Sequence, residues 1–362
     1  MKVQRVRIPD TDRVTWLVLD DNYLSIQPIQ SYLQYLESIE RSPNTVHAYA
    51  GHLKLFWEFL RDSKIDWKDI SLEKLADFIH WLRSPEPKVI SIQTQEAKRT
   101  ERTVNTILSA VCNFYDFHYR MGNVEELKVY GQQFYSGSRS YKPFLHHITK
   151  GKPVKKSLIK LKEPRIPPEI LTGKQVRELI SACNCRRDKF LISLLYESGM
   201  RIGQALGLRH EDVRSWDNEI YIVPRTNNVN GVRAKSKNSY VVHVSKELMT
   251  LYSDYLIYEY PEDLESDYVF INIWEGETGN ALTYSSVAAL FRRLEKKTGI
   301  KTSPHIFRHT HATELIRQGW DMAHVQKRLG HASVQTTINT YTHLTDNDLK
   351  EAYQEYLQQR DK

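Results

Sequence analysis

The chain has 362 residues, enough for two domains with separate cores, and carries a formal charge of +7 at neutral pH. The excess of basic residues favours a polyanionic partner, of which nucleic acid is the commonest. Three cysteines provide no disulfide framework, no run of 18 apolar residues could span a membrane, and the N-terminus lacks the apolar segment of a secretory signal. We therefore expect a cytoplasmic protein without a membrane segment.

The first domain is predicted to be helical. Residues 1–24 alternate polar and apolar side chains around positions 13–19, which indicates a short strand or hairpin arm. Residues 25–130 then show the three- and four-residue spacing of four amphipathic helices; Ser42-Pro43 opens the second, and Gly122 stops the fourth. The expected inward residues are Ile29, Tyr32, Leu33, Leu36, Ile39, Val46, Tyr49, Leu53, Phe56, Leu60, Leu75, Ile79, Leu82, Val104, Leu108, Val111 and Tyr115.

Residues 131–168 are predicted to be a basic linker. Between Gly131 and Arg165 the hydrophobic periodicity is lost, and nine basic residues stand against one acidic residue. A merely solvated linker would have no reason to exclude acids, whereas lysine and arginine gain affinity by displacing counterions from phosphates. We therefore expect DNA contacts here and beside the start of the fourth helix, at Lys152, Lys155, Lys156, Lys98, Arg99 and Arg102.

Residues 169–362 are predicted to form a second domain of helices with one small sheet. Helices are expected after Thr172, around residues 190–195, and from Ser285 onwards, with a helix stop at Gly299. Two strands are expected at 219–223 and 240–244, joined by a polar stretch that contains glycine. The fold class predicted for the whole chain is therefore mainly α with a small antiparallel β-sheet. We interpret Cys183 and Cys185 as ordinary buried or semi-buried thiols.

Six polar residues of this second domain form a pattern that suits phosphodiester chemistry. Cleaving DNA with an internal nucleophile requires an attacking oxygen, fixed donors for the non-bridging oxygens and a proton for the leaving oxygen. A tyrosine with a pKa near 10 needs help to lose its proton, and the planar fork of arginine suits phosphate oxygens. The six residues are Arg201, Lys235, His305, Arg308, His331 and Tyr341.

Alone, each of these residues has a simpler interpretation. An isolated Arg201 is most simply a surface arginine, and Tyr341 is one of 21 tyrosines. His309 and His311, close to His305, invite a metal site, but residues two apart on a helix point in different directions, and no cysteine or acid completes the set. The order and spacing of the six residues, and not any one of them alone, therefore indicate phosphodiester chemistry. We expect no metal site.

Segments that carry these residues resemble the boxes of tyrosine recombinases of the phage integrase type, and the four-helix first domain resembles that family's core-binding domain. Residues 282–285 ahead of 291–294 are further similar to transposase A proteins of resistance transposons. The matching boxes are Tyr196-Glu197-Ser198-Gly199-Met200-Arg201-Ile202-Gly203, His305-Ile306-Phe307-Arg308-His309-Thr310-His311-Ala312-Thr313, Leu329-Gly330-His331 and Thr340-Tyr341-Thr342-His343.

The resemblance implies a division of roles at the scissile phosphate. Tyr341 would attack the phosphorus, giving a 3′-phosphotyrosyl link and a free 5′-hydroxyl. Arg201 and Arg308 would hold the non-bridging oxygens, and His331 would hydrogen-bond the same phosphate. His305 would assist removal of the tyrosine proton. Each strand would be cut and rejoined without ATP, metal or another cofactor.

The general acid for the 5′-oxygen would be a lysine on a β-hairpin. Alignment of the loop with the following strand favours Lys235, with Lys237 and Arg233 as near alternatives. Gln204 is a departure, because many family members have glutamate three residues after the first arginine. A glutamine can still hydrogen-bond the arginine, but it lends no charge.

The resemblance also implies double-stranded DNA as a partner, with a dimer on DNA, a tetramer in the synapse, and possible partner recombinases from the same element of a bacterium. Thr345 can cap a tail helix with a stripe at Leu349, Tyr353 and Leu357, which would pack on its own domain or on a neighbouring subunit. A regulator that binds DNA without cutting it, a topoisomerase and an RNA-binding protein are the alternatives. The intact set of six residues favours a recombinase.

Overall fold

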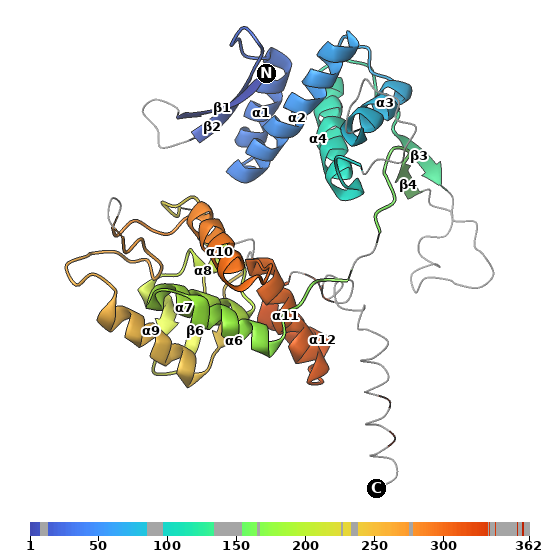
Figure 1. Cartoon of the computed structure of the whole chain (residues 1–362). Helices are drawn as coiled ribbons and strands as arrows, with labels where there is room; N and C mark the ends of the chain where they lie inside the picture. Colours follow the sequence, from blue (N-terminus) through green and yellow to red (C-terminus); the bar gives the residue numbers. More distant parts are fainter. Residues whose placement is uncertain are drawn as a thin grey trace. The chain divides into compact units, whose positions relative to one another are not determined.

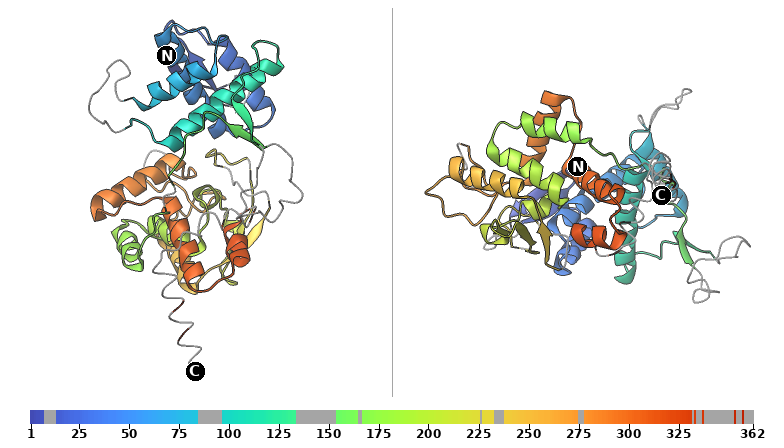
Figure 2. Two further views of the ribbon diagram at one scale, coloured as in Figure 1. Left: turned by 90° about the vertical axis from the view of Figure 1, so that its right-hand side faces the viewer. Right: turned by 90° about the horizontal axis from the view of Figure 1, so that it is seen from below.

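The computed structural model divides into two compact units, Met1–Arg165 and Ile166–Lys362. Each unit is described by itself (Figures 1 and 2). The structure describes residues 1–7, 14–84, 97–133, 154–164, 167–225, 227–232, 238–274 and 278–331, and the single positions 333, 337, 353 and 357.

The first unit is a helical domain preceded by a hairpin. Strands β1 (Lys2–Arg7) and β2 (Val14–Leu19) pair antiparallel, which confirms the predicted arm, and β2 packs against α2. The four helices that follow confirm the predicted four: α1 (Gln27–Ser38), α2 (Pro43–Ser63), α3 (Leu72–Arg83) and α4 (Glu101–Arg120) (Figure 1).

Side-chain caps fix where these helices begin. The hydroxyl groups of Ser42, Ser71 and Thr100 each accept a hydrogen bond from the backbone N–H three residues later. Edge-to-face aromatic contacts fill the core, with the Phe56 and Phe78 rings 5.0 Å apart. The prediction that Ile39 lies in the core is wrong: its side chain is 43% exposed, because α1 ends at Ser38 and the chain turns there.

The expected linker contains ordered structure. Strands β3 (Tyr130–Gln133) and β4 (Val154–Ser157) pair antiparallel, and the backbone beyond β4 returns to α4. There, Asn105 donates from Nδ2 to the carbonyl of Leu161 at 3.0 Å and accepts the Leu161 N–H at 2.8 Å. The described residues 154–164 thus belong to the first unit, through contacts with distant residues that local periodicity does not reveal.

The second unit surrounds α7, a helix buried on most sides, with further helices and one three-stranded antiparallel sheet of order β5-β6-β7. This confirms the predicted fold class, while β5 and α9 escaped the sequence analysis. The elements are α6 (Gly173–Ala182), α7 (Arg186–Ser198), α8 (Ile202–Ala205), a 3₁₀ turn (His210–Asp212), β5 (Val213–Arg214), β6 (Glu219–Ile222), β7 (Tyr240–His243), α9 (Lys246–Tyr258), α10 (Tyr284–Thr298), α11 (Pro304–Arg317) and α12 (Met322–Leu329).

Helix α7 packs against both α9 and α11, and residues such as Phe190, Leu191 and Ile192 are buried around its circumference. Cys183 and Cys185 are buried as expected, and burial raises the pKa of Cys183 to about 12 and that of Cys185 to about 11. In the described part of the chain, no helix is both long and apolar enough to cross a bilayer.

The expected tail helix falls almost wholly outside the described residues, including Thr345 and Leu349. Of its stripe, Tyr353 and Leu357 are described, and both lie in helical conformation. The packing of this tail stays a prediction.

Replacement of Asn105 by alanine should loosen the return segment of the first unit. The substitution leaves the half-buried carbonyl and N–H of Leu161 without their side-chain partner, a loss of about 1 kcal/mol in the free energy of unfolding. Urea denaturation of the full chain measures it, and trypsin should cut faster after Lys160 and Lys162. Thr106→Ala, on the exposed face of the same helix, is the control, and equal behaviour of the two variants would contradict the anchoring role.

Candidate active site

The second unit brings four of the six predicted site residues together. Arg201 immediately precedes α8, His305 and Arg308 lie on α11, and His331 follows α12. The charges of Arg308, Arg201 and His305 all act on the His331 ring, where they add to the effect of burial in lowering its pKa. Lys235 and Tyr341 lie outside the described residues, as do the alternatives Lys237 and Arg233.

Arg308 is the buried cation of the site, with 3% of its surface exposed. Its Nη1 donates to the carbonyl of Gly199 at 2.7 Å, and its Nη2 donates to the carbonyl of Leu329 at 2.8 Å. These carbonyls lie at the C-terminal ends of α7 and α12, where helix dipoles favour a positive charge. Two carbonyl oxygens thus hold the guanidinium in place.

Arg201 and Gln204 form a small network at the start of α8. The backbone N–H of Arg201 donates to Oε1 of Gln204 at 2.8 Å, and the Arg201 Nη1 lies 3.5 Å from the carbonyl of Gly330. Gln204 is buried and donates from Nε2 to the hydroxyl of Tyr240 at 3.0 Å. A glutamate at this position could not make that donation when ionised, so the departure from the family pattern has a structural use here.

Gly330 is required by the turn that presents His331. Its φ is +60°, and a Cβ built there would lie 2.6 Å from the Tyr240 ring. Beyond this turn, the Nδ1 of His331 is 2.8 Å from the hydroxyl of Thr337, and the His331 carbonyl accepts from Gln326 at 2.8 Å. Burial and the nearby cations lower the pKa of His331 to about 4, so the ring is neutral at pH 7 and retains one N–H to donate.

The three histidines of α11 have different surroundings. His305 is exposed, and its ring stands nearly perpendicular to that of His309, with centroids 5.1 Å apart. Burial, with His305 and Arg308, lowers the pKa of His309 to about 4. His311 is buried against Arg328 instead. Within the described residues, no three His, Cys, Asp or Glu side chains are grouped so as to hold a metal ion.

Family models match both units of the chain. The model described as "Phage integrase family" matches residues 169–348, and "Phage integrase, N-terminal SAM-like domain" matches residues 29–122. Transposase A from transposon Tn554 of Staphylococcus aureus is 47% identical over 362 residues, which cover 100% of this chain and 99% of that protein. The chain belongs to the phage integrase family of tyrosine recombinases. It is an enzyme that cleaves and rejoins DNA.

More distant relatives and solved structures agree with this assignment. Tyrosine recombinase XerD of Listeria monocytogenes is 25% identical, over 91% of this chain and 97% of that protein. The Tn1549 transposon integrase in complex with a circular intermediate DNA superposes with a TM-score of 0.62 at 15% identity, covering 91% of this recombinase and 99% of that chain. XerH bound to its difH substrate gives a TM-score of 0.58 at 19% identity, covering 91% and 84%. These two structures share the recombinase fold.

The residues predicted to contact DNA are only partly described. Lys98 and Arg102 are exposed beside the start of α4. Arg99 is half-buried and donates to the carbonyl of Leu82 at 3.0 Å, so it also holds the end of α3. Lys155 and Lys156 lie in β4, with side chains outside the described set, and Lys152 lies outside it altogether. Their contacts with DNA stay predictions.

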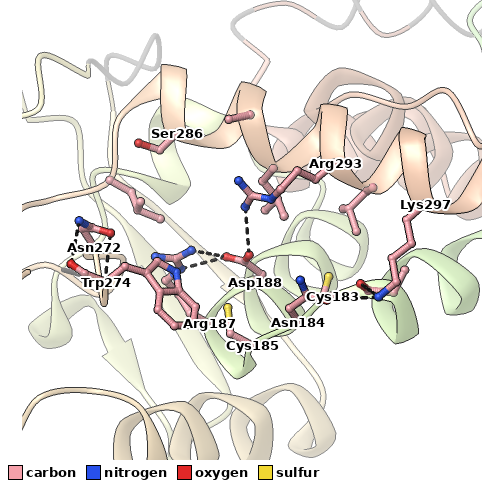
Figure 3. Close-up of a pocket in the computed structure, with 15 residues that line it drawn as sticks. Cys183, Asn184, Cys185, Arg187, Asp188, Asn272, Trp274, Ser286, Arg293 and Lys297 are labelled. Carbon is pink, nitrogen blue, oxygen red and sulfur yellow. Dashed lines mark hydrogen bonds and ion pairs between the residues drawn. The ribbon is translucent and has the colours of Figure 1, made fainter. Parts of the chain in front are cut away.

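A pocket of about 430 Å³ lies between α10 and the junction of α6 with α7 (Figure 3). None of the four described site residues lines it. Asp188 meets Arg187 at 2.7 Å and Arg293 at 3.8 Å, and Lys297 donates to the carbonyl of Ala182 at 2.8 Å (Figure 3). Because its lining shares no residue with that set of four, the pocket is separate from the described part of the candidate active site.

Sequence reasoning missed several residues that shape the site. Tyr240, Thr337, Gln326 and Arg328 all contact it or its supports, yet none belongs to a spacing pattern that singles it out. The one usable signal was the position of Arg328, directly before the Leu329-Gly330-His331 box.

Acidification should destabilise the second unit through its buried histidines. His309 and His331 have pKa values lowered to about 4 and His311 to about 3, whereas an unfolded histidine titrates near 6.5. The unfolded chain therefore takes up protons first, so this stability is present above pH 6.5 and is lost as the pH falls toward 4. The slope is at most about 1.4 kcal/mol per pH unit for each histidine.

Urea denaturation at pH 7, 6 and 5 measures this slope. His311→Gln should reduce it, whereas His324→Gln, on the exposed surface of α12, should leave it unchanged. A free energy of unfolding that stays constant over this range would contradict the assignment of neutral, buried rings.

Proposed function

We propose that this recombinase moves a mobile element by cutting and rejoining DNA through a transient covalent link to Tyr341. The observation that carries the proposal is the convergence of Arg201, Arg308 and His331 on one place, with His305 beside them. The transposase A of Tn554 matches the chain over its full length, which supports a role in excision and integration of an element.

In the proposed reaction, the phenolic oxygen of Tyr341 attacks phosphorus, and the bond between phosphorus and the 5′-oxygen breaks. The phenol gives up its proton with assistance from His305, and the leaving 5′-oxygen receives one from Lys235. A 5′-hydroxyl of another strand then attacks the phosphotyrosine and releases the tyrosine. Each step exchanges one phosphoester for another, so the cycle needs no external energy source.

The arrangement of the described residues supports stabilisation of the transition state. Negative charge grows on the two non-bridging oxygens as the tyrosine attacks, and donors fixed beforehand cost no reorganisation at that moment. Arg308 is fixed by two carbonyls, and Arg201 lies against the carbonyl of Gly330. A neutral His331 adds a hydrogen-bond donor.

The proposal extends to assembly and place of action. Exchange between two duplexes requires a nucleophile for each of four strands, so we propose a dimer on each DNA site and a tetramer in the synapse. Recombinases from the same element are possible further partners, and the bacterial cytoplasm, with the enzyme at the nucleoid when it is bound to DNA, is the proposed place of action.

A trapping experiment tests the nucleophile. A nicked half-site that carries the end of the element releases a short 5′ fragment on cleavage, so the covalent step cannot reverse. In EDTA, the wild-type recombinase should give a shifted, protease-sensitive band on a denaturing gel, and Tyr341→Phe should give none. Tyr258→Phe removes an exposed hydroxyl elsewhere in the unit and should react normally. An adduct with Tyr341→Phe would show that the nucleophile is another residue.

A change of leaving group tests the general acid. Lys235→Ala should slow cleavage of ordinary DNA by about 100-fold or more, because the 5′-oxygen must leave without a proton. A substrate with sulfur at the 5′-bridging position should cleave normally, because a thiolate needs no proton to leave. Lys237→Ala and Arg233→Ala should cleave both substrates alike. Rescue by sulfur in one of these two variants, and not in Lys235→Ala, would move the role to that residue.

A further inference from the structure

Arg328 contacts residues of three other elements of the second unit, although it is not one of the six predicted site residues. It occupies the last turn of α12, just before the Leu329-Gly330-His331 turn. Its Nε donates to Nε2 of His311 on α11 at 2.9 Å. Its Nη2 donates to the carbonyl of Glu197 at the end of α7 and to the carbonyl of His243 at the end of β7, each at 3.0 Å.

His311 is suited to receive this guanidinium. Its side chain is buried, with 7% exposed, and burial lowers its pKa to about 3, so the ring is neutral. Arginine can only donate, hence Nε2 must be the accepting nitrogen and Nδ1 must carry the proton. The ring also hydrogen-bonds the backbone of Tyr196, which uses that remaining proton. Both nitrogens of His311 therefore have assigned partners.

The end of α7 that Arg328 contacts is itself fixed. The carboxylate of Glu197 accepts hydrogen bonds from the backbone N–H and, at 2.9 Å, from the hydroxyl of Ser245, the residue that caps α9. Gly199 follows with φ of +62°, and a Cβ there would lie 2.6 Å from the His311 ring. His311 thus packs directly on the turn whose carbonyl holds Arg308.

The two carbonyls that hold Arg308 both lie next to contacts of this pair. Gly199 lies two residues after Glu197, and Leu329 directly follows Arg328. We propose that His311 and Arg328 form a positioning pair, which holds the ends of α7 and α12 at the separation that places Arg308 and His331 for catalysis. The inference rests on the recombinase function proposed above and assigns this pair no contact with DNA.

Single-turnover cleavage of the half-site substrate at saturating protein tests the pair. His311→Phe keeps a ring but removes the acceptor, and Arg328→Leu removes the donor. Each should slow adduct formation by about tenfold, with the Kd for DNA unchanged within about twofold. His324→Phe and Lys327→Leu, at exposed positions of α12, are matched controls and should cleave at the wild-type rate.

Two further variants separate positioning from general damage to the fold. His311→Gln offers an amide oxygen to Arg328 and should recover cleavage to within about threefold of wild type. The double variant His311→Phe/Arg328→Leu should be slowed no more than Arg328→Leu alone, about tenfold, because Arg328→Leu already removes the contact that His311→Phe breaks. Wild-type rates in the single variants, a slowing of about a hundredfold in the double variant, or no recovery with glutamine would each overturn the proposal.

Hydrogen exchange gives a result that does not require catalysis. The amides of Gly330 and His331 donate to the carbonyls of Lys327 and Gln326, and both should exchange faster in His311→Phe but not in His324→Phe. If the wild-type chain forms no adduct, the proposed function fails. Hydrogen exchange alone then decides whether His311 and Arg328 position the ends of α7 and α12. Unchanged exchange at these two amides overturns the positioning proposal even if the wild-type recombinase cleaves DNA.

Discussion

The candidate active site of the second unit depends on one buried guanidinium. Arg308 lies between the C-terminal ends of α7 and α12 and donates to a carbonyl of each. The C-terminal end of a helix carries partial negative charge and carbonyls that lack hydrogen-bond donors. A guanidinium between two such ends offsets the charge and supplies the donors. The same cation is the one proposed to meet the phosphate. Structure and chemistry therefore share a residue, and neither role can change without the other.

What could be predicted from the sequence was set by local signals. Ser42 and Pro43 fix the start of α2 through a cap and a preset φ, whatever lies elsewhere in the chain. Gly122 and Gly299 likewise mark the ends of α4 and α10, as predicted. Helix α9 had such signals too, a serine cap followed by buried Leu248, Tyr252 and Tyr255, and they were overlooked.

Contacts between distant residues account for what could not be predicted. The pairing of β3 with β4 joins residues more than 20 positions apart, and the return of the chain to α4 rests on a hydrogen bond between Asn105 and Leu161. The contacts of Arg328 exist only in the folded unit, where it meets His311 in the middle of α11 and backbone carbonyls at the ends of α7 and β7. The hydroxyl of Tyr240 on β7 likewise accepts a hydrogen bond from Gln204 on α8. Lys235 and Tyr341 lie outside the described residues, so their roles still rest on family resemblance and chemistry.

The turn at Gly330 has a consequence for how this enzyme can evolve. Two independent restrictions act there, a left-handed backbone and a tyrosine ring that occupies the space of a Cβ. A second mutation that shrank Tyr240 would relieve the crowding, but the left-handed backbone would still cost about 1–2 kcal/mol for most residues other than glycine. No single second mutation removes both the backbone restriction and the clash with the Tyr240 ring. Second-site suppressors of a Gly330 mutation should therefore be rarer than suppressors of an ordinary core mutation.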